Sequence, residues 1–111
     1  MKEQVVLKNI NDFENKSLLI VDDDNPFRER LARAMEKKGF KVSQAESVKK
    51  GVESVKLKKP GFAVVDLRLG DGNGLEVVKE IQTTNSESRI IMLTGYGNIP
   101  TAVAAIKEGA I

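Results

Sequence analysis

The sequence predicts an α/β protein in which helices cover both faces of a parallel sheet. Short, continuously apolar runs alternate with amphipathic stretches along the chain. Continuous apolar runs are typical of strands that are buried on both faces, and alternation with helices favours right-handed parallel crossovers. The length of 111 residues suits one domain that can bury its own core.

Four short runs have the composition of buried strands, and each ends in a polar residue or a turn. The runs are Ser17–Val21, Phe40–Ala45, Phe62–Val65 and Arg89–Leu93. The second run alternates more strongly between apolar and polar residues than the others. We therefore expect it near an edge of the sheet.

Each strand is followed by a stretch with apolar residues at helical spacing. We expect Asn25 to cap the first helix, with Pro26 at its first position, and Gly39 to end it. Gly51 is expected to weaken the second helix, and the glycine-rich residues 70–74 are expected to form a loop. The remaining helices are expected over Ser47–Leu57, Leu75–Thr84 and Pro100–Gly109.

The composition excludes several classes of chemistry. The chain has no histidine and no cysteine, which excludes histidine bases, thiolate nucleophiles and zinc sites built from these residues. The net charge is +2, the basic residues are scattered, and four Phe with one Tyr give little surface for stacking bases. No apolar run approaches the ~20 residues that span a bilayer. We expect a cytoplasmic protein that does not contact the membrane.

Polar residues follow three of the predicted strands. The first strand runs into Asp22, Asp23 and Asp24, the third into Asp66 and the fourth into Thr94. Ligands of open α/β sheets bind outside the carboxyl ends of the strands, so these side chains should meet in one pocket. Clustered carboxylates repel one another unless a cation enters, and an oxygen-only ligand set favours Mg²⁺. A carboxylate beside Mg²⁺ could accept a phosphoryl group as an aspartyl phosphate.

Other interpretations of the acidic cluster remain open at this stage. Asp23 or Asp24 could do no more than cap the helix that follows the strand. The Asp22-x-Asp24 spacing also suits a phosphohydrolase with an aspartate nucleophile, although Pro26 stands where such enzymes prefer a small hydroxyl residue. A third possibility is a dimerisation module that works without phosphorylation. An EF-hand is excluded, because Phe27 occupies the glycine position of a loop that begins at Asp22.

Three segments resemble the response-regulator receiver domain. They are Leu18-Leu19-Ile20-Val21-Asp22-Asp23-Asp24, Val64-Val65-Asp66-Leu67-Arg68-Leu69 and Met92-Leu93-Thr94-Gly95-Tyr96-Gly97. The stretches 31–40 and 101–107 are similar to the RegA/PrrA/ActR subgroup, which comprises bacterial redox-responsive transcription regulators. The resemblance implies a flavodoxin-like (CheY-like) fold with the strand order 2-1-3-4, and a signalling domain rather than an enzyme.

The resemblance also implies a role for each matching residue. Asp66 would be the phosphoacceptor for a sensor histidine kinase, and Thr94 the switch hydroxyl. Asp22 and Asp23 would hold Mg²⁺ together with Asp66, with Asp23 binding directly and Asp22 through water. The backbone carbonyl of Arg68 would complete the protein ligands.

The chain ends before several features of the family. The fifth strand with its switch aromatic, a Lys-Pro pair and the fifth helix would follow Ile111. We therefore expect a truncated receiver domain over residues 17–111, with residues 1–16 as an N-terminal extension. Without the lysine that contacts the phosphoryl group, switching should be impaired in this fragment. DNA would be contacted only through a C-terminal domain that is absent here.

The expected truncation leaves the strand Arg89–Leu93 at an unprotected edge of the sheet. This strand contains four consecutive apolar residues, 90–93. Exposed apolar strands recruit partners, so we expect a homodimer, formed by edge-strand pairing or by swapping of the last helix.

Overall fold

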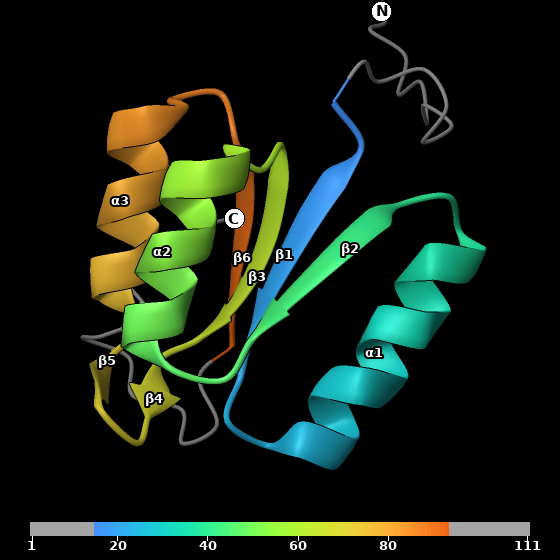
Figure 1. Cartoon of the computed structure of the whole chain (residues 1–111), viewed down its shortest axis with the longest axis horizontal. Helices are drawn as coiled ribbons and strands as arrows, with labels where there is room; N and C mark the ends of the chain where they lie inside the picture. The colour runs from blue at the N-terminus through green and yellow to red at the C-terminus, as the bar shows by residue number, and fades with distance from the viewer. Residues whose placement is uncertain (1–14, 94–111) are drawn as a thin grey trace, which may run out of the picture.

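A four-stranded parallel sheet forms the centre of the protein in the computed structural model, which describes residues 15–93 (Figure 1). The strand order is β2-β1-β3-β6, which is the order 2-1-3-4 that the resemblance implies, with β6 as the fourth predicted strand. The strands are β1 (Ser17–Val21), β2 (Lys41–Ala45), β3 (Phe62–Asp66) and β6 (Arg89–Leu93). The helices are α1 (Asn25–Lys37), α2 (Val48–Lys58) and α3 (Leu75–Thr84).

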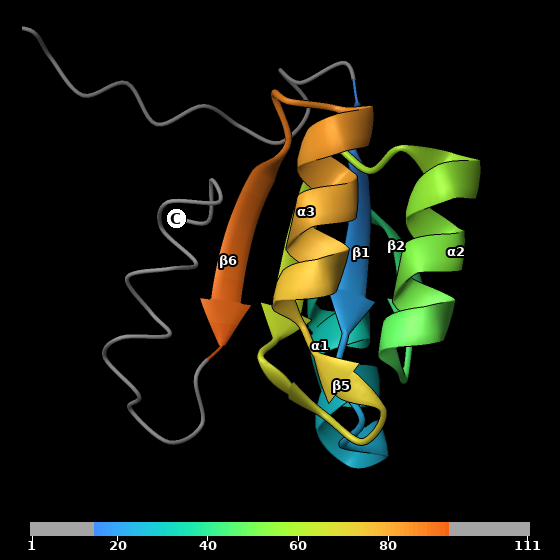
Figure 2. The ribbon, with the colours of Figure 1, turned by 90° about the vertical axis from the view of Figure 1, so that its left-hand side faces the viewer.

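The helices lie in two layers, with α1 on one face of the sheet and α2 and α3 together on the other (Figures 1 and 2). The residues of β1 alternate between these layers. Leu19 and Val21 pack toward α2 and α3, whereas Leu18 and Ile20 pack toward α1. Both sets are almost fully buried, which explains why β1 reads as a continuous apolar run. Within residues 15–93, no helix has the length and apolarity required to cross a membrane.

The register of the sheet brings the ends of β1 and β3 together. Val21 pairs with Val65, so the next residues, Asp22 and Asp66, leave neighbouring strands at the same edge. On the other side, the backbone N–H of Asp22 donates to the carbonyl of Ala45 at 3.0 Å, which continues the β1–β2 pairing past the end of β1. The carboxyl ends of the central strands therefore present acidic residues side by side.

The start of α1 differs by one residue from the prediction. Asp24, not Asn25, is the N-cap, and its side chain accepts a hydrogen bond from the backbone N–H of Phe27 at 3.1 Å. Pro26 consequently occupies the second helical position. This outcome agrees with the capping alternative for Asp24 alone, because a carboxylate caps as well as an amide and is stabilised by the helix dipole.

The second strand also starts one residue later than predicted. The backbone N–H of Phe40 still donates to the carbonyl of Met35 at 3.2 Å, which keeps Phe40 in the turn after α1. Its ring packs edge-on against Phe62, with the centroids 5.1 Å apart. Phe40 therefore behaves as a core residue of the α1 layer without belonging to the strand.

Gly51 lies inside α2 because the helix packs closely against its neighbours. A Cβ atom at this position would lie 3.0 Å from Val77 Cγ2 and 3.3 Å from both methyl groups of Val21. The lower helix propensity of glycine is therefore offset by tighter packing of α2 between β1 and α3. Ser47 caps this helix by accepting from the backbone N–H of Lys50 at 3.1 Å.

The predicted loop at residues 70–74 contains more structure than expected. Residues Arg68–Leu69 (β4) pair with Gly72–Asn73 (β5) as a short antiparallel hairpin between β3 and α3. Three predicted features lie outside the described residues: most of the N-terminal extension, the residue Thr94, and the helix over Pro100–Gly109. Of that extension, Asn15 contacts the turn before β3, where its side chain donates to the carbonyl of Lys59 at 3.2 Å.

Candidate metal centre

Three carboxylates from two neighbouring strand ends form a compact cluster. Asp22 and Asp23 follow β1 and Asp66 ends β3, and each offers one oxygen within 4.8 Å of the other two. Asp22 is buried, Asp66 is partly buried and Asp23 is exposed. An oxygen-only set of this size fits a hard divalent cation, which would keep water on its open side.

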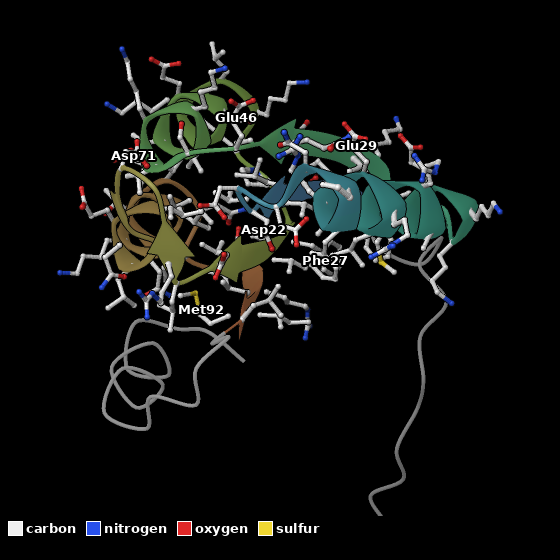
Figure 3. All side chains as sticks on the ribbon, turned by 90° about the horizontal axis from the view of Figure 1, so that it is seen from below. Asp22, Phe27, Glu29, Glu46, Asp71 and Met92 are labelled. Carbon is white, nitrogen blue, oxygen red and sulfur yellow. The ribbon has the colours of Figure 1, made fainter. Side chains whose placement is uncertain are left out.

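The carboxylates open into a cleft at the carboxyl end of the sheet. Its volume is about 590 Å³, and Figure 3 views the molecule from this end, with Asp22 and Met92 labelled. The cleft walls come from the segments after β1 and β3 and from the end of β6. The lining residues are Asp22, Asp23, Asp24, Asp66, Arg68, Leu69, Gly70 and Leu93. Of the predicted site residues, Thr94 alone lies outside the described part of the chain.

The surroundings of the Asp66 carboxyl group shift its pKa. Burial raises the pKa of its carboxyl group above the ordinary value of 3.8, and the negative charges of Asp22 and Asp23 raise it further. A hydrogen bond from the backbone N–H of Arg68, 3.1 Å from Asp66 Oδ1, opposes this shift. The folded protein thus holds Asp66 where burial and two neighbouring carboxylates disfavour its charged form.

The raised pKa of Asp66 predicts a pH dependence of stability. Between pH 3.8 and the folded-state pKa, the folded chain binds more protons than the unfolded chain, so stability should fall as the pH rises through this window. At neutral pH without metal, Asp66→Asn should therefore make the protein slightly more stable, because it removes a charge that burial and the neighbouring carboxylates disfavour. Melting temperatures from pH ~4 to ~7 in EDTA measure both effects. Parallel curves of melting temperature against pH for the wild type and Asp66→Asn would contradict the assignment of this pH dependence to Asp66.

Backbone contacts fix the turn that carries Asp22 and Asp23. Asp22 Oδ1 accepts from the backbone N–H of Asp24 at 2.9 Å. From the other side, the buried guanidinium of Arg28 donates to the backbone carbonyl of Asp22 at 2.9 Å. The same guanidinium reaches Asn25 Oδ1 at 2.6 Å and Gln44 Oε1 at 2.9 Å. Arg28 therefore ties the acidic turn to α1 and β2.

Arg28 was not among the predicted site residues, although its sequence position carries a signal. Arg28 stands at helical spacing with Leu31, Ala32 and Met35, which pack in the α1 layer. A charged residue inside an apolar stripe needs partners for its polar atoms. That position therefore predicts a structural arginine, but only the fold reveals that one partner is the backbone of the acidic turn.

The comparison with protein families agrees with this geometry. Residues 18–111 match the response regulator receiver domain. The chain belongs to this family. Receiver domains are signalling domains, and they bind a divalent metal at an aspartate cluster such as the one that Asp22, Asp23 and Asp66 form here.

The receiver domain is similar to curated regulators of about twice its length. It is 58% identical over 97 residues to the acid tolerance regulatory protein ActR of Sinorhizobium medicae, covering 87% of this chain and 50% of that protein. It is 58% identical over 96 residues to the photosynthetic apparatus regulatory protein RegA of Rhodobacter capsulatus, covering 86% and 52%. The chain thus spans about half the length of these relatives.

Solved structures confirm the predicted CheY-like fold of this receiver domain. A response regulator from Burkholderia pseudomallei, described with a phosphorylated aspartic acid, a calcium ion and citrate, has a TM-score of 0.81 at 38% identity. The match covers 86% of this chain and 56% of that one. A CheY-like receiver domain protein from Methanospirillum hungatei has a TM-score of 0.81 at 27% identity, covering 87% and 78%.

Proposed function

We propose that this receiver domain binds Mg²⁺ and accepts a phosphoryl group on Asp66 from a sensor histidine kinase. The observation that carries the proposal is the convergence of Asp22, Asp23 and Asp66, whose oxygens lie within 4.8 Å of one another beside an open cleft. The receiver unit would comprise residues 17–111, with residues 1–16 as an N-terminal extension.

Each residue of the cluster has a distinct part in this proposal. As the resemblance implies, Asp23, which is exposed, would bind the ion directly, and Asp22, which is buried, would contact it through water. Asp66 and the backbone carbonyl of Arg68 would supply further oxygens, and both of these residues line the cleft. Thr94, which follows Leu93 in the sequence, would bind a phosphoryl oxygen through its hydroxyl group.

The phosphoryl transfer needs an ionised nucleophile at neutral pH. A carboxylate oxygen of Asp66 forms a bond to phosphorus while the phosphorus–nitrogen bond of the donor phosphohistidine breaks, and the imidazole keeps the bonding electrons. Mg²⁺ would neutralise charge on both the carboxylates and the phosphoryl group. The backbone N–H of Arg68 already holds one oxygen of Asp66, which leaves the other to attack.

Magnesium should stabilise the protein against heat. At ten times the dissociation constant, mass action contributes about 1.4 kcal/mol, which raises the melting temperature of a domain of this size by about 5–10 °C. Asp23→Asn should remove most of this shift, because it deletes the ligand that binds directly. Melting curves with and without Mg²⁺, and with Ca²⁺ for comparison, measure the effect.

Asp24→Asn is the matched control for this experiment. It removes a neighbouring charge, but asparagine retains the cap on α1. Its magnesium shift should stay within a few degrees of that of the wild type. A full shift in Asp23→Asn would place the ion elsewhere and overturn the proposal.

We further propose that the protein is cytoplasmic, that it reaches DNA only through a C-terminal domain of a longer regulator, and that two copies associate. Within the described part of the chain, residues 15–93, β6 is an edge strand of the sheet, and Ile91 on that strand is 49% exposed, which supports the last point. Light scattering at high protein concentration measures the association, and a stable monomer would remove this part of the proposal.

A further inference from the structure

The hairpin β4–β5 forms one wall of the acidic cleft. Its first strand, Arg68–Leu69, lines the cleft together with Gly70 at the turn. The backbone N–H of Arg68 donates to Asp66, and the side chain of Leu69 is buried in the core beneath α2 and α3. A shift of the hairpin would therefore displace atoms that touch the central carboxylate.

The tip of this hairpin contacts the start of α2. The carboxylate of Asp71 accepts hydrogen bonds from the backbone N–H of Val48 at 2.8 Å and of Lys49 at 3.1 Å. These two bonds hold the pKa of Asp71 below its ordinary value. Ser47 caps the next N–H, that of Lys50. Asp71 thus satisfies α2 amides that no carbonyl of the same helix can reach.

Packing reinforces this contact between the hairpin and α2. Val48 and Leu69 belong to the same buried cluster. Gly72, the residue after Asp71, would carry a Cβ atom 3.4 Å from Val48 Cγ2, so the hairpin backbone lies directly against the helix. Figure 3 shows Asp71 beside the start of α2, with Glu46 labelled near the same helix. The hairpin cannot move toward solvent without breaking these bonds.

We propose that Asp71 is a positioning residue, which clamps the hairpin to α2 and thereby holds the Arg68 carbonyl in place for the metal ion. The proposal rests on the proposed metal centre and deepens it. Ion binding at the cleft and hydrogen bonding at the start of α2 are then thermodynamically coupled. What the clamp adds to metal affinity, the metal must add to the stability of the clamp.

The first arm of the test is a Mg²⁺ titration of four variants. Asp71→Ala should weaken magnesium binding about 5-fold, at the lower end of typical couplings between sites. Asp71→Asn keeps one accepting oxygen and should recover part of the affinity. Glu46→Gln removes a charge at the same end of α2, where Glu46 pairs with Lys50, and should bind like the wild type. Asp23→Asn reports on the metal centre itself.

The second arm measures amide hydrogen exchange at Val48 and Lys49 by NMR. Saturating Mg²⁺ should slow exchange of these two amides in the wild type by the same factor, about 5-fold, as reciprocity requires. In Asp71→Ala the two amides should exchange faster and should no longer respond to Mg²⁺. A residue with a merely structural role would not produce this metal dependence.

The outcomes separate the clamp from the metal centre. If Asp23→Asn loses affinity while Asp71→Ala binds like Glu46→Gln, the metal centre stands and the clamp is overturned. If Mg²⁺ leaves the two amides unchanged in the wild type, the clamp is also overturned. If Asp23→Asn itself keeps wild-type affinity, the ion lies elsewhere and both proposals fail.

Discussion

Asp66→Asn should abolish phosphorylation of the chain by acetyl phosphate. The wild type, given Mg²⁺ and a long incubation, should gain the mass of one phosphoryl group, whereas the variant should keep the mass of the unmodified chain. The reason is that Asp66 is the carboxylate at the centre of the cleft, with Asp22 and Asp23 beside it. The amide of asparagine is too weak a nucleophile to replace a carboxylate. Intact mass spectrometry provides the measurement.

Asp24→Asn is again the matched control, since Asp24 lines the same cleft but its side chain caps α1. This variant should be phosphorylated to the same extent as the wild type. Equal labelling of wild type and Asp66→Asn would show that the acceptor is another residue. A wild type that gains no mass would contradict phosphoryl acceptance by this chain.

Among the substitutions considered, Gly74→Ala should cause the largest loss of folding stability. A Cβ atom at Gly74 would lie 2.1 Å from the backbone carbonyl oxygen of Asp66 and 3.0 Å from Val65 Cγ1. Backbone atoms of a central strand cannot move aside as the end of a flexible side chain can, so relieving the clash requires a shift of the start of α3 or of the end of β3. We expect a loss of about 3 kcal/mol, or roughly 15 °C in melting temperature, and weaker Mg²⁺ binding because Asp66 is displaced.

The matched control for this prediction is Gly70→Ala in the same hairpin region. The nearest atom to a Cβ at Gly70 is Asp23 Oδ2 at 3.9 Å, an ordinary contact. Its melting temperature should stay within a few degrees of that of the wild type. Chemical denaturation of both variants compares their free energies of unfolding. Equal stabilities would mean that the α3 start has room to adjust.

The sheet could be predicted because its strands follow a simple local rule. Each central strand buries both faces, so runs such as Leu18–Val21 are continuously apolar. The strand order was implied by the resemblance to receiver domains, whereas the residues themselves predicted only right-handed parallel crossovers. The proximity of Asp22 and Asp66 was also predictable, because the carboxyl ends of neighbouring parallel strands lie at the same edge of the sheet.

The features that the sequence did not predict depend on contacts between distant segments. The β4–β5 hairpin contains only two residue pairs and lies in a glycine-rich stretch, which reads as a loop. The bonds from Val48 and Lys49 to Asp71 join segments that share no local pattern. Gly51 reads as a weak point of its helix until Val21 and Val77 are seen to occupy the space around it.

Asp22 and Asp23 follow β1, whereas Asp66 ends β3, and the chain forms α1, β2 and α2 between these two paired strands. The cluster therefore joins the two ends of a β-α-β-α-β segment. Loop-closure entropy makes such a non-local pairing slow relative to helix formation. Divalent ion capture can therefore occur only after β3 has docked on β1. In a stopped-flow refolding experiment, the rate of ion binding would therefore report the rate at which β3 docks on β1.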